Sequence, residues 1–293
     1  MTLFFQQVID GIATGSIYAS LALALVLIYR STHIVNFAQG EMAMFSTFIA
    51  WQFHEWGWPI WGAIGVTLAI SFVGGMAVER TFVRPVENAP VLTIVIVTLG
   101  LLLIFNQSAG WLWNFLVKSF ASPFPRHVVS AGDVRVSTQS IGIVVVLFLT
   151  LLVLWLLFDK TKIGLAMRAA AENPESSGLV GINVGRMLML GWGLAATLGA
   201  LSGVMVAPRL FLEPNMMVGV LLYGFAGALL GGVSNPIGAV IGGFIVGVLE
   251  ALVGTYVPFV GNELKLSVAL VLIVGVLVFK PSGLFGRVVV RRV

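Results

Sequence analysis

The feature that most constrains this chain is a succession of nine apolar segments, each close to the length that crosses a lipid bilayer. A crossing α-helix needs about 20 mostly apolar residues. Only 10% of the 293 residues are charged, whereas soluble domains carry about 25%. The sequence therefore predicts an all-α, polytopic transmembrane helical bundle. Several segments are rich in glycine and two are short, so we expect eight or nine crossings. The segments are Val8–Tyr29, Ile34–Phe53, Ile60–Val78, Val91–Val117, Ser140–Phe158, Met187–Ala207, Met216–Leu230, Ile237–Val253 and Leu264–Phe279.

The positions of lysine and arginine predict which connections face the cytoplasm. Short loops rich in these residues stay on the cytoplasmic side during insertion. With nine crossings and an outside N-terminus, most of the 16 basic residues fall on inside connections, which include 159–186 and the C-terminal tail. The connection from Lys118 to Thr138 then lies outside, and an even number of crossings would move only the N-terminus and the early spans. These loops also explain the net charge of +4, so we expect no nucleic acid partner.

One polar stretch, Asp159–Arg186, interrupts the apolar segments, and we call it the elbow. Its middle, Met167–Glu172, consists of good helix formers. Pro174 suits the first turn of a second short helix, for which Asn173 is a suitable cap. The sequence predicts a cytoplasmic elbow with a short helix that can dock another protein.

A first group of polar residues lies at the start of the second apolar segment. Glu41 follows closely after Asn36, Gln39 and His33. A charge inside the bilayer costs about 2.5–3.5 kcal/mol on insertion scales. The cluster either lines a translocation pathway or holds a kinked helix start through hydrogen bonds. Alternatively, Glu41 lies near the headgroups, where it caps the helix or pairs with Arg30.

A second group lies late in the chain. Gly231, Gly232 and Asn235 precede an apolar segment that contains Glu250. The glycines allow close approach between helices or form a broken helix beside the pathway. Glu250 either makes a structural hydrogen bond to a neighbouring helix or faces the pathway. Both groups combine helix breakers with a carboxylate, as expected if the two segments belong to an internal repeat.

Two further groups have a structural explanation. Asn106 and Gln107 interrupt the fourth apolar segment, where amides form hydrogen bonds between helices. Tryptophans enriched at a membrane surface form an aromatic belt. We assign such a belt at the outer surface to Trp51, Trp56, Trp58 and Trp61 around Pro59.

No motif for catalysis or cofactor binding occurs in the sequence. The chain has no cysteine, and its three histidines are too scattered to suggest a zinc site. No lysine lies in a G-x-x-x-x-G-K-[ST] loop, and the H-E-x-x-H and G-x-S-x-G motifs are absent. We therefore expect a chain that is not an enzyme, holds no metal or cofactor, and does not bind ATP through a P-loop.

The chain resembles the permease subunits of bacterial branched-chain amino acid ABC importers of the LivH type. Matching stretches follow one another along nearly the whole sequence, so residues 1–293 are expected to form one permease domain. The family commonly has histidine at the position of Gln39, so the role of that position is not carried over. The stretches are Gly15–Tyr29 followed by Asn36–Glu41, Met167–Asn173 running into Leu179–Asn183, and Leu229–Gly243 with the tail Lys280–Gly286.

The resemblance implies a multi-pass protein of the bacterial inner membrane that works with three kinds of partner. These are a companion permease, expected to be a different chain, two cytoplasmic ABC ATPases and a periplasmic substrate-binding protein. A coupling helix in the elbow, matched by Ala170–Ile182, would enter a groove on an ATPase. The expected coupling residues are Ala170, Glu172, Asn173, Gly181 and Ile182. The expected residues of the pathway or of a helix break are Asn36, Gln39, Glu41, Gly231, Gly232, Asn235 and Glu250.

The function implied is ATP-driven import of branched-chain or other hydrophobic amino acids. Importers of urea and short-chain amides use closely similar permeases and are the first alternative. A second alternative is an ion-coupled secondary carrier or channel, in which Glu41 and Glu250 would be the coupling carboxylates.

Overall fold

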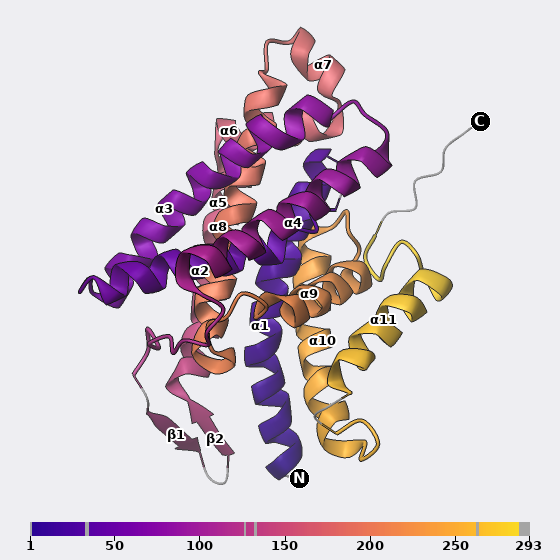
Figure 1. Ribbon diagram of the computed structural model, residues 1–293. Coiled ribbons are helices and arrows are strands. Elements are labelled where there is room, and N and C mark those ends of the chain that lie inside the picture. The colour runs from indigo at the N-terminus through magenta and orange to yellow at the C-terminus, as the bar shows by residue number, and fades with distance from the viewer. Residues whose placement is uncertain (1, 33–34, 126, 132–133, 262–263, 287–293) are drawn as a thin grey trace. The chain divides into compact units, whose positions relative to one another are not determined.

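The computed structural model of the protein is built from α-helices, and each of the nine apolar segments coincides with one of them (Figure 1). The structure describes residues 2–32, 35–125, 127–131, 134–261 and 264–286. The predicted all-α class is confirmed across these ranges. The nine helices are α1 (Thr2–Thr32), α2 (Gln39–Glu55), α3 (Ile60–Val78), α4 (Val91–Trp113), α5 (Thr138–Lys160), α8 (Val184–Leu210), α9 (Met217–Gly231), α10 (Pro236–Tyr256) and α11 (Lys265–Phe279).

Length and hydropathy divide these helices into two groups. In the described ranges, α1, α3, α4, α5, α8 and α10 are each long and apolar enough to cross a membrane. Helices α9 and α11 are apolar but have only 15 residues each, and α2 has 17. Six helices therefore qualify alone, while the shorter ones bring the total near the eight or nine crossings expected.

Two connections carry structure of their own. The elbow forms α6 (Lys162–Glu172) and the short helix α7 (Pro174–Leu179). The long connection after α4 contains an antiparallel hairpin that the sequence did not predict, with β1 (Val128–Ala131) paired to β2 (Val134–Ser137). Valines occupy several positions of both strands, and β-branched residues favour strand conformation.

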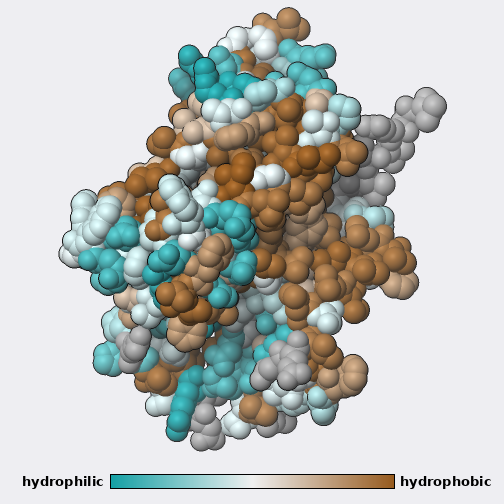
Figure 2. Space-filling model, viewed as in Figure 1, coloured by the Kyte–Doolittle hydropathy of each residue, from teal (hydrophilic) through white to brown (hydrophobic). Residues whose placement is uncertain are grey.

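The chain divides into two compact units. Unit 1 comprises Met1–Val26, Phe124–Val144 and Gly219–Val293, and unit 2 comprises Leu27–Pro123 and Val145–Val218. Figure 1 shows α7 at the far end of unit 2, beyond α6. Hydrophilic side chains gather at this end (Figure 2).

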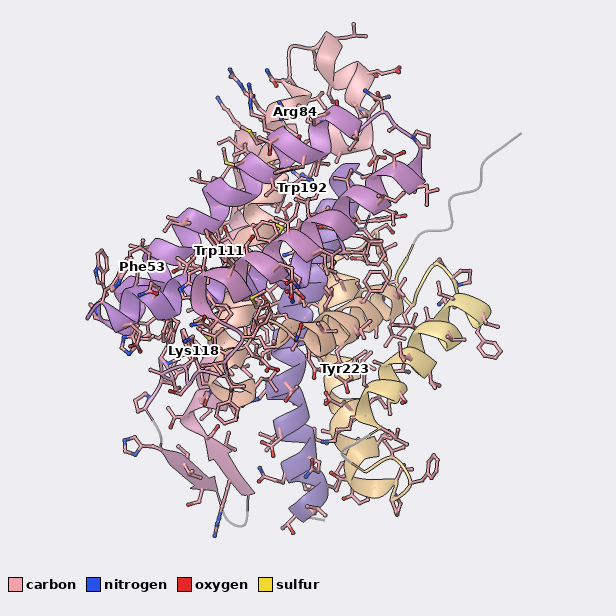
Figure 3. All side chains as sticks on the ribbon, in the orientation of Figure 1. Phe53, Arg84, Trp111, Lys118, Trp192 and Tyr223 are labelled. Carbon is pink, nitrogen blue, oxygen red and sulfur yellow. The ribbon has the colours of Figure 1, made fainter. Side chains whose placement is uncertain are left out.

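Small residues let the helices of unit 2 pack closely. Helix α8 is the centre of this unit, with α2, α3 and α6 packed against it. A Cβ added at Gly193 would lie 2.9 Å from the carbonyl oxygen of Phe72, and one at Gly203 would lie 2.8 Å from that of Ala43. Trp192 fills the interior of the unit and is 2% exposed (Figure 3). Close backbone contact of this kind holds helices together in lipid, where water provides no driving force.

Small residues also let α1, α9 and α10 of unit 1 pack closely. A Cβ at Gly247 would collide with the backbone of Gly15, and one at Gly243 would collide with the backbone of Ala19. Helix α10 therefore lies directly on α1. This contact fixes the position of the polar side chains that follow on α10.

Candidate functional site

Side-chain caps shape the elbow. Thr161, Asn173 and Asn183 each accept a hydrogen bond from the backbone N–H three residues further on, at 2.9–3.0 Å. These bonds satisfy backbone donors at the starts of α6, α7 and α8. The predicted helix over Met167–Glu172 and the second helix that begins at Pro174 behind the Asn173 cap are both confirmed.

The tip of the elbow presents two apolar side chains. Leu179 is 89% exposed and Val180 is 76% exposed. The turn that follows uses Gly181 at φ +86°, a left-handed conformation that favours glycine. Neither Leu179 nor Val180 was predicted as a contact residue, although an apolar pair next to a glycine in a polar stretch was the available signal.

The five expected coupling residues occupy different environments. Glu172, Asn173 and Gly181 are exposed, and Ile182 is half-buried. Ala170 is 1% exposed and lies on α6, which packs against α8. Ala170 therefore serves packing within the chain, while the other four are at least partly accessible to a partner.

A buried ion pair ties α3 to the root of the elbow. Arg84 donates from Nε and Nη2 to the two carboxylate oxygens of Glu79, at 3.1 and 2.8 Å. Its Nη2 also donates to the carbonyl oxygen of Gly185, at 2.6 Å, in the first turn of α8. Glu79 is 1% exposed and begins a π-helical stretch, Glu79–Val83, that follows α3. We call this arrangement the Arg84 clamp (Figure 3).

The clamp was not predicted, because the positions of the basic residues were used only to orient the connections between the helices. A bidentate guanidinium–carboxylate pair is both strong and specific in direction. A glutamate five residues before an arginine at the end of an apolar segment was the signal that could have indicated it.

The start of α2 is held by amide side chains. The Oδ1 of Asn36 accepts the backbone N–H of Ala38 at 3.0 Å, and its Nδ2 donates to Oε1 of Gln39 at 3.3 Å. Gln39 donates in turn to the carbonyl oxygen of Ala195 on α8, at 2.9 Å. Asn36 and Gln39 are both 0% exposed. These hydrogen bonds hold the start of α2, and the pathway role expected for this cluster stays a prediction.

Glu41 meets α4 and the segment before α9. It is 3% exposed, and its Oε2 accepts a hydrogen bond from Nδ2 of Asn106 at 3.3 Å. The same nitrogen lies 3.0 Å from the carbonyl oxygen of Pro214 and 3.1 Å from Oδ1 of Asn215. Gln107 donates to Oδ1 of Asn106. The hydrogen bond between helices predicted for Asn106 is confirmed. The bond of Gln107 goes to its neighbour on the same helix, so the bond between helices predicted for Gln107 stays a prediction.

The alternative explanation of Glu41 as a cap or a partner of Arg30 is wrong. The residue at the N-cap of α2 is Ala38, with no side-chain hydrogen bond at the cap. Within the described residues, Arg30 forms no ion pair with Glu41. Burial explains the difference, because Glu41 is 3% exposed and accepts a hydrogen bond from Asn106 on α4. His33 lies outside the described residues.

The turn between α9 and α10 receives the C-terminal tail. Gly232 has φ +105°, which requires glycine, and a Cβ at Gly231 would collide with Gly238. Asn235 begins α10 by accepting the N–H groups of residues 237 and 238, at 3.1 and 3.2 Å. Its Nδ2 donates to the carbonyl oxygen of Phe285 at 3.2 Å. Two stretches that carried the family resemblance, 229–243 and 280–286, are thus hydrogen-bonded to each other.

Glu250 lies on α10 among aromatic side chains. The hydroxyl of Tyr18 on α1 donates to its Oε2 at 2.7 Å. The ring of Tyr223 on α9 stacks on that of Tyr18, with centroids 4.7 Å apart. Lys265 at the start of α11 contributes a nearby positive charge. Glu250 is half-buried, and it makes the hydrogen bond to a neighbouring helix that was one of its two expected roles.

The two polar groups resemble each other only at their asparagines. Asn36 and Asn235 both accept backbone N–H groups at the start of a helix. Glu41, however, lies in the first turn of α2, whereas Glu250 lies near the other end of α10. The carboxylates are therefore not equivalent by position, and the internal repeat stays a prediction.

The family is decided by comparison with known proteins. A family model described as "Branched-chain amino acid transport system / permease component" matches residues 7–277. This chain belongs to that family. The permease is 29% identical to LivH of Escherichia coli (strain K12), a high-affinity branched-chain amino acid transport system permease protein, over 99% of this chain and 98% of LivH. It is 28% identical to BraD of Pseudomonas aeruginosa, which has the same description, over 99% and 98% of the two chains.

A solved structure, PsaBC from Streptococcus pneumoniae in complex with Fab, is similar to 94% of the permease and 89% of that chain, with 14% identity and a TM-score of 0.47. The resemblance to LivH-type permeases is confirmed by the sequence relatives. Family membership and the apolar helices make the permease a multi-pass integral membrane protein with a transport role rather than an enzymatic one.

Proposed function

We propose that this permease is the membrane subunit of an ATP-driven importer of branched-chain or other hydrophobic amino acids. The observation that carries the proposal is the family match over residues 7–277 together with nearly full-length similarity to LivH and BraD. LivH and BraD are described as branched-chain amino acid permeases, and that substrate class is extended here to this chain.

The elbow is the proposed docking site for a cytoplasmic ABC ATPase. Its tip combines exposed Leu179 and Val180 with the exposed polar residues Glu172 and Asn173. Interface cores are apolar and their rims polar, so this arrangement suits insertion of the tip into a groove. Gly181 permits the tight turn that brings the chain back to α8.

Movement of the elbow would reach the membrane helices through two rigid connections. Helix α6 packs on α8, and the Arg84 clamp joins the first turn of α8 to the end of α3. Helix α8 is itself packed against α2 and α3. Closure of the ATPases on ATP would then change the arrangement of these helices. ATP can shift the equilibrium between the two arrangements only by the difference in its affinity for them.

The remaining partners follow from the same proposal. Two permeases, expected to be different chains, would form the pathway in the inner membrane, with two ATPases inside and a substrate-binding protein outside. The elbow and the C-terminus would be cytoplasmic. Lys118 and Trp51, both expected on the outer side, are in contact, with Nζ 4.6 Å from the ring centroid, which supports placing that connection and the tryptophan belt together.

An ion-coupled carrier is less well supported. It would need an acidic side chain open to the pathway, whereas Glu41 is 3% exposed and accepts a hydrogen bond from Asn106, and Glu250 is hydrogen-bonded to Tyr18. A urea or short-chain amide importer would use the same geometry. Uptake of labelled leucine and of labelled urea is compared in cells with and without the gene. If the gene increased the uptake of urea and not of leucine, the permease would be assigned to a urea importer.

The docking proposal is tested by an acidic substitution at the tip. We expect Val180→Asp to abolish co-purification of the ATPase subunits, because a charge would replace an apolar contact. Val129→Asp is the matched control, since Val129 is 54% exposed on β1 and is expected on the opposite side. Normal co-purification with Val180→Asp would show that the tip is not the docking site.

The Arg84 clamp is tested through coupling. Arg84→Lys keeps the charge but loses the bidentate geometry. We expect more ATP hydrolysed per substrate imported, with the ATPases still bound. Arg80→Lys, an exposed neighbour, is expected to leave this ratio unchanged, and an unchanged ratio for Arg84→Lys as well would remove the clamp from the mechanism.

A further inference from the structure

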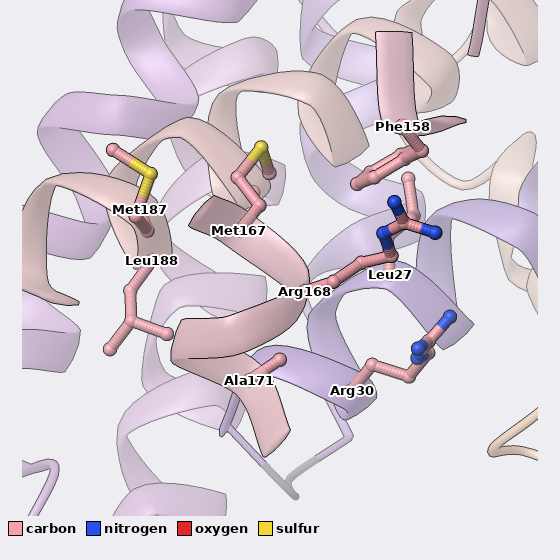
Figure 4. A pocket seen from close by; sticks show the side chains of 9 residues that line it. Leu27, Arg30, Phe158, Met167, Arg168, Ala171, Met187 and Leu188 are labelled. Carbon is pink, nitrogen blue, oxygen red and sulfur yellow. The ribbon is translucent and has the colours of Figure 1, made fainter. Parts of the chain in front are cut away.

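A small cavity lies beside α6 in unit 2. Its volume is about 40 Å³, and its apolar wall includes Leu27, Phe158, Met167 and Met187. Arg30 and Arg168 also line it. Figure 4 shows both arginine side chains extending to the same side of α6, with Phe158 beside that of Arg168. The cavity therefore combines an apolar wall with two cationic groups.

The positive charge of the cavity is only partly balanced. Nη1 of Arg168 donates to Oδ1 of Asp159 at 3.0 Å, and Nε of Arg168 is buried without a hydrogen-bond partner in the described part of the chain. Arg30 forms no ion pair with any described residue. Two cations and one carboxylate leave a net positive charge. An anion is the complementary ligand.

The surroundings of the cavity point to an amphipathic anion. Phe158 comes from α5, a helix that exposes large apolar side chains along its length. Leu149, Leu152 and Leu156 on this helix are 55%, 50% and 43% exposed. An exposed apolar face on a membrane helix suits lipid acyl chains, and basic pockets between helices at the cytoplasmic side suit anionic headgroups.

We propose that this cavity binds the phosphate of an anionic phospholipid from the cytoplasmic leaflet, with Arg30 and Arg168 as its ligands and the acyl chains along α5. Guanidinium groups bind phosphate through charge-assisted hydrogen bonds. The inference rests on the proposed function, because that function places α6 at the cytoplasmic surface. Since α6 is the first helix of the elbow, the lipid would attach the elbow to the membrane that surrounds it.

The test uses the permease complex with the subunits that co-purify with it. The complex is placed in nanodiscs of phosphatidylcholine with or without phosphatidylglycerol, and retained phosphatidylglycerol is measured by native mass spectrometry. We expect retention to weaken about fivefold for Arg30→Gln and about 30-fold when Arg168→Gln is added, from roughly 1 kcal/mol for each basic residue. Arg30→Gln breaks no ion pair described above, so it tests the site without loss of folding.

Arg186→Gln is the matched control, because Arg186 is an exposed basic residue of the elbow that does not line the cavity. Equal retention by Arg30→Gln, the double variant and this control would overturn the proposal. Inorganic phosphate is the second probe. If it competed with phosphatidylglycerol at equal concentration, the ligand would be a free anion and the lipid assignment would be wrong. ATPase co-purification is followed on the same samples, so loss of lipid binding with ATPases retained would leave the proposed function intact.

Discussion

Glu41 and Glu250 are both acidic residues on otherwise apolar helices, yet the chain holds them by different means. Glu41 is 3% exposed and receives an amide hydrogen from Asn106, a residue from another helix. Glu250 is half-buried and receives a phenolic hydrogen from Tyr18. The amide network of Glu41 joins α2, α4 and the segment before α9, whereas the bond of Glu250 depends on how closely α10 lies on α1.

This difference separates two roles that the sequence left open for each residue. The buried carboxylate of Glu41 acts as a structural junction, because Asn106 connects it to α4 and to the segment before α9. The hydrogen bond of Glu250 to Tyr18 forms only where the glycines let α10 pack closely on α1. Substitution of the glycines at the contact between α1 and α10 should therefore lower stability more than substitution of Glu250. Substitution of Glu41 should lower stability directly.

The largest expected effect is at Gly247. A Cβ there would collide with the backbone of Gly15, so Gly247→Val should separate α10 from α1 and lose the bond between Tyr18 and Glu250. Overpacking costs about 1–3 kcal/mol, and more where backbone must move. The melting temperature of the purified permease, measured by thermal denaturation, should fall strongly. Gly275→Val in α11 has no neighbour within 4 Å at the added atom, and an equal drop there would contradict the packing argument.

The next effect is at Glu41. Glu41→Ala should destabilise the permease by about 2 kcal/mol, because truncation of this buried side chain leaves a cavity where α2 meets α4. Glu41→Gln keeps an acceptor of similar size and is expected to stay near the wild type in both thermal stability and transport. If Glu41→Gln were stable but inactive in transport, the carboxylate charge would be part of the transport chemistry, and the structural role would be insufficient.

The smallest effect is at Tyr18. Tyr18→Phe removes the 2.7 Å hydrogen bond to Glu250 but keeps the stacking on Tyr223. The expected loss is about 1 kcal/mol, the net value of a typical hydrogen bond. Tyr256→Phe provides the control on α10, since Tyr256 is 52% exposed. A loss for Tyr18→Phe as large as that for Glu41→Ala would remove the distinction between the two carboxylates.

The positions of the helices and the caps of the elbow were predictable because their causes are local. The lengths of the apolar segments determine where the nine helices lie. The start of α7 is determined by two adjacent residues, the cap Asn173 and Pro174 after it. The partner of Glu41 and the bond from Arg84 to Gly185 were not predictable. Asn106 is 65 residues from Glu41, and Gly185 is 101 residues from Arg84. Such contacts depend on which helices pack together, and hydropathy gives no information about that.

The most direct test of the account is Val180→Cys, labelled with a cysteine-directed photo-crosslinker that is activated in native membranes. Because the chain contains no cysteine of its own, the probe attaches to the permease at this position alone. We predict a covalent adduct with a P-loop ATPase, and none with that subunit from the same probe at Val129. Adducts at Val180 with lipid or with an extracytoplasmic protein, and none with an ATPase, would contradict the assignment of the elbow.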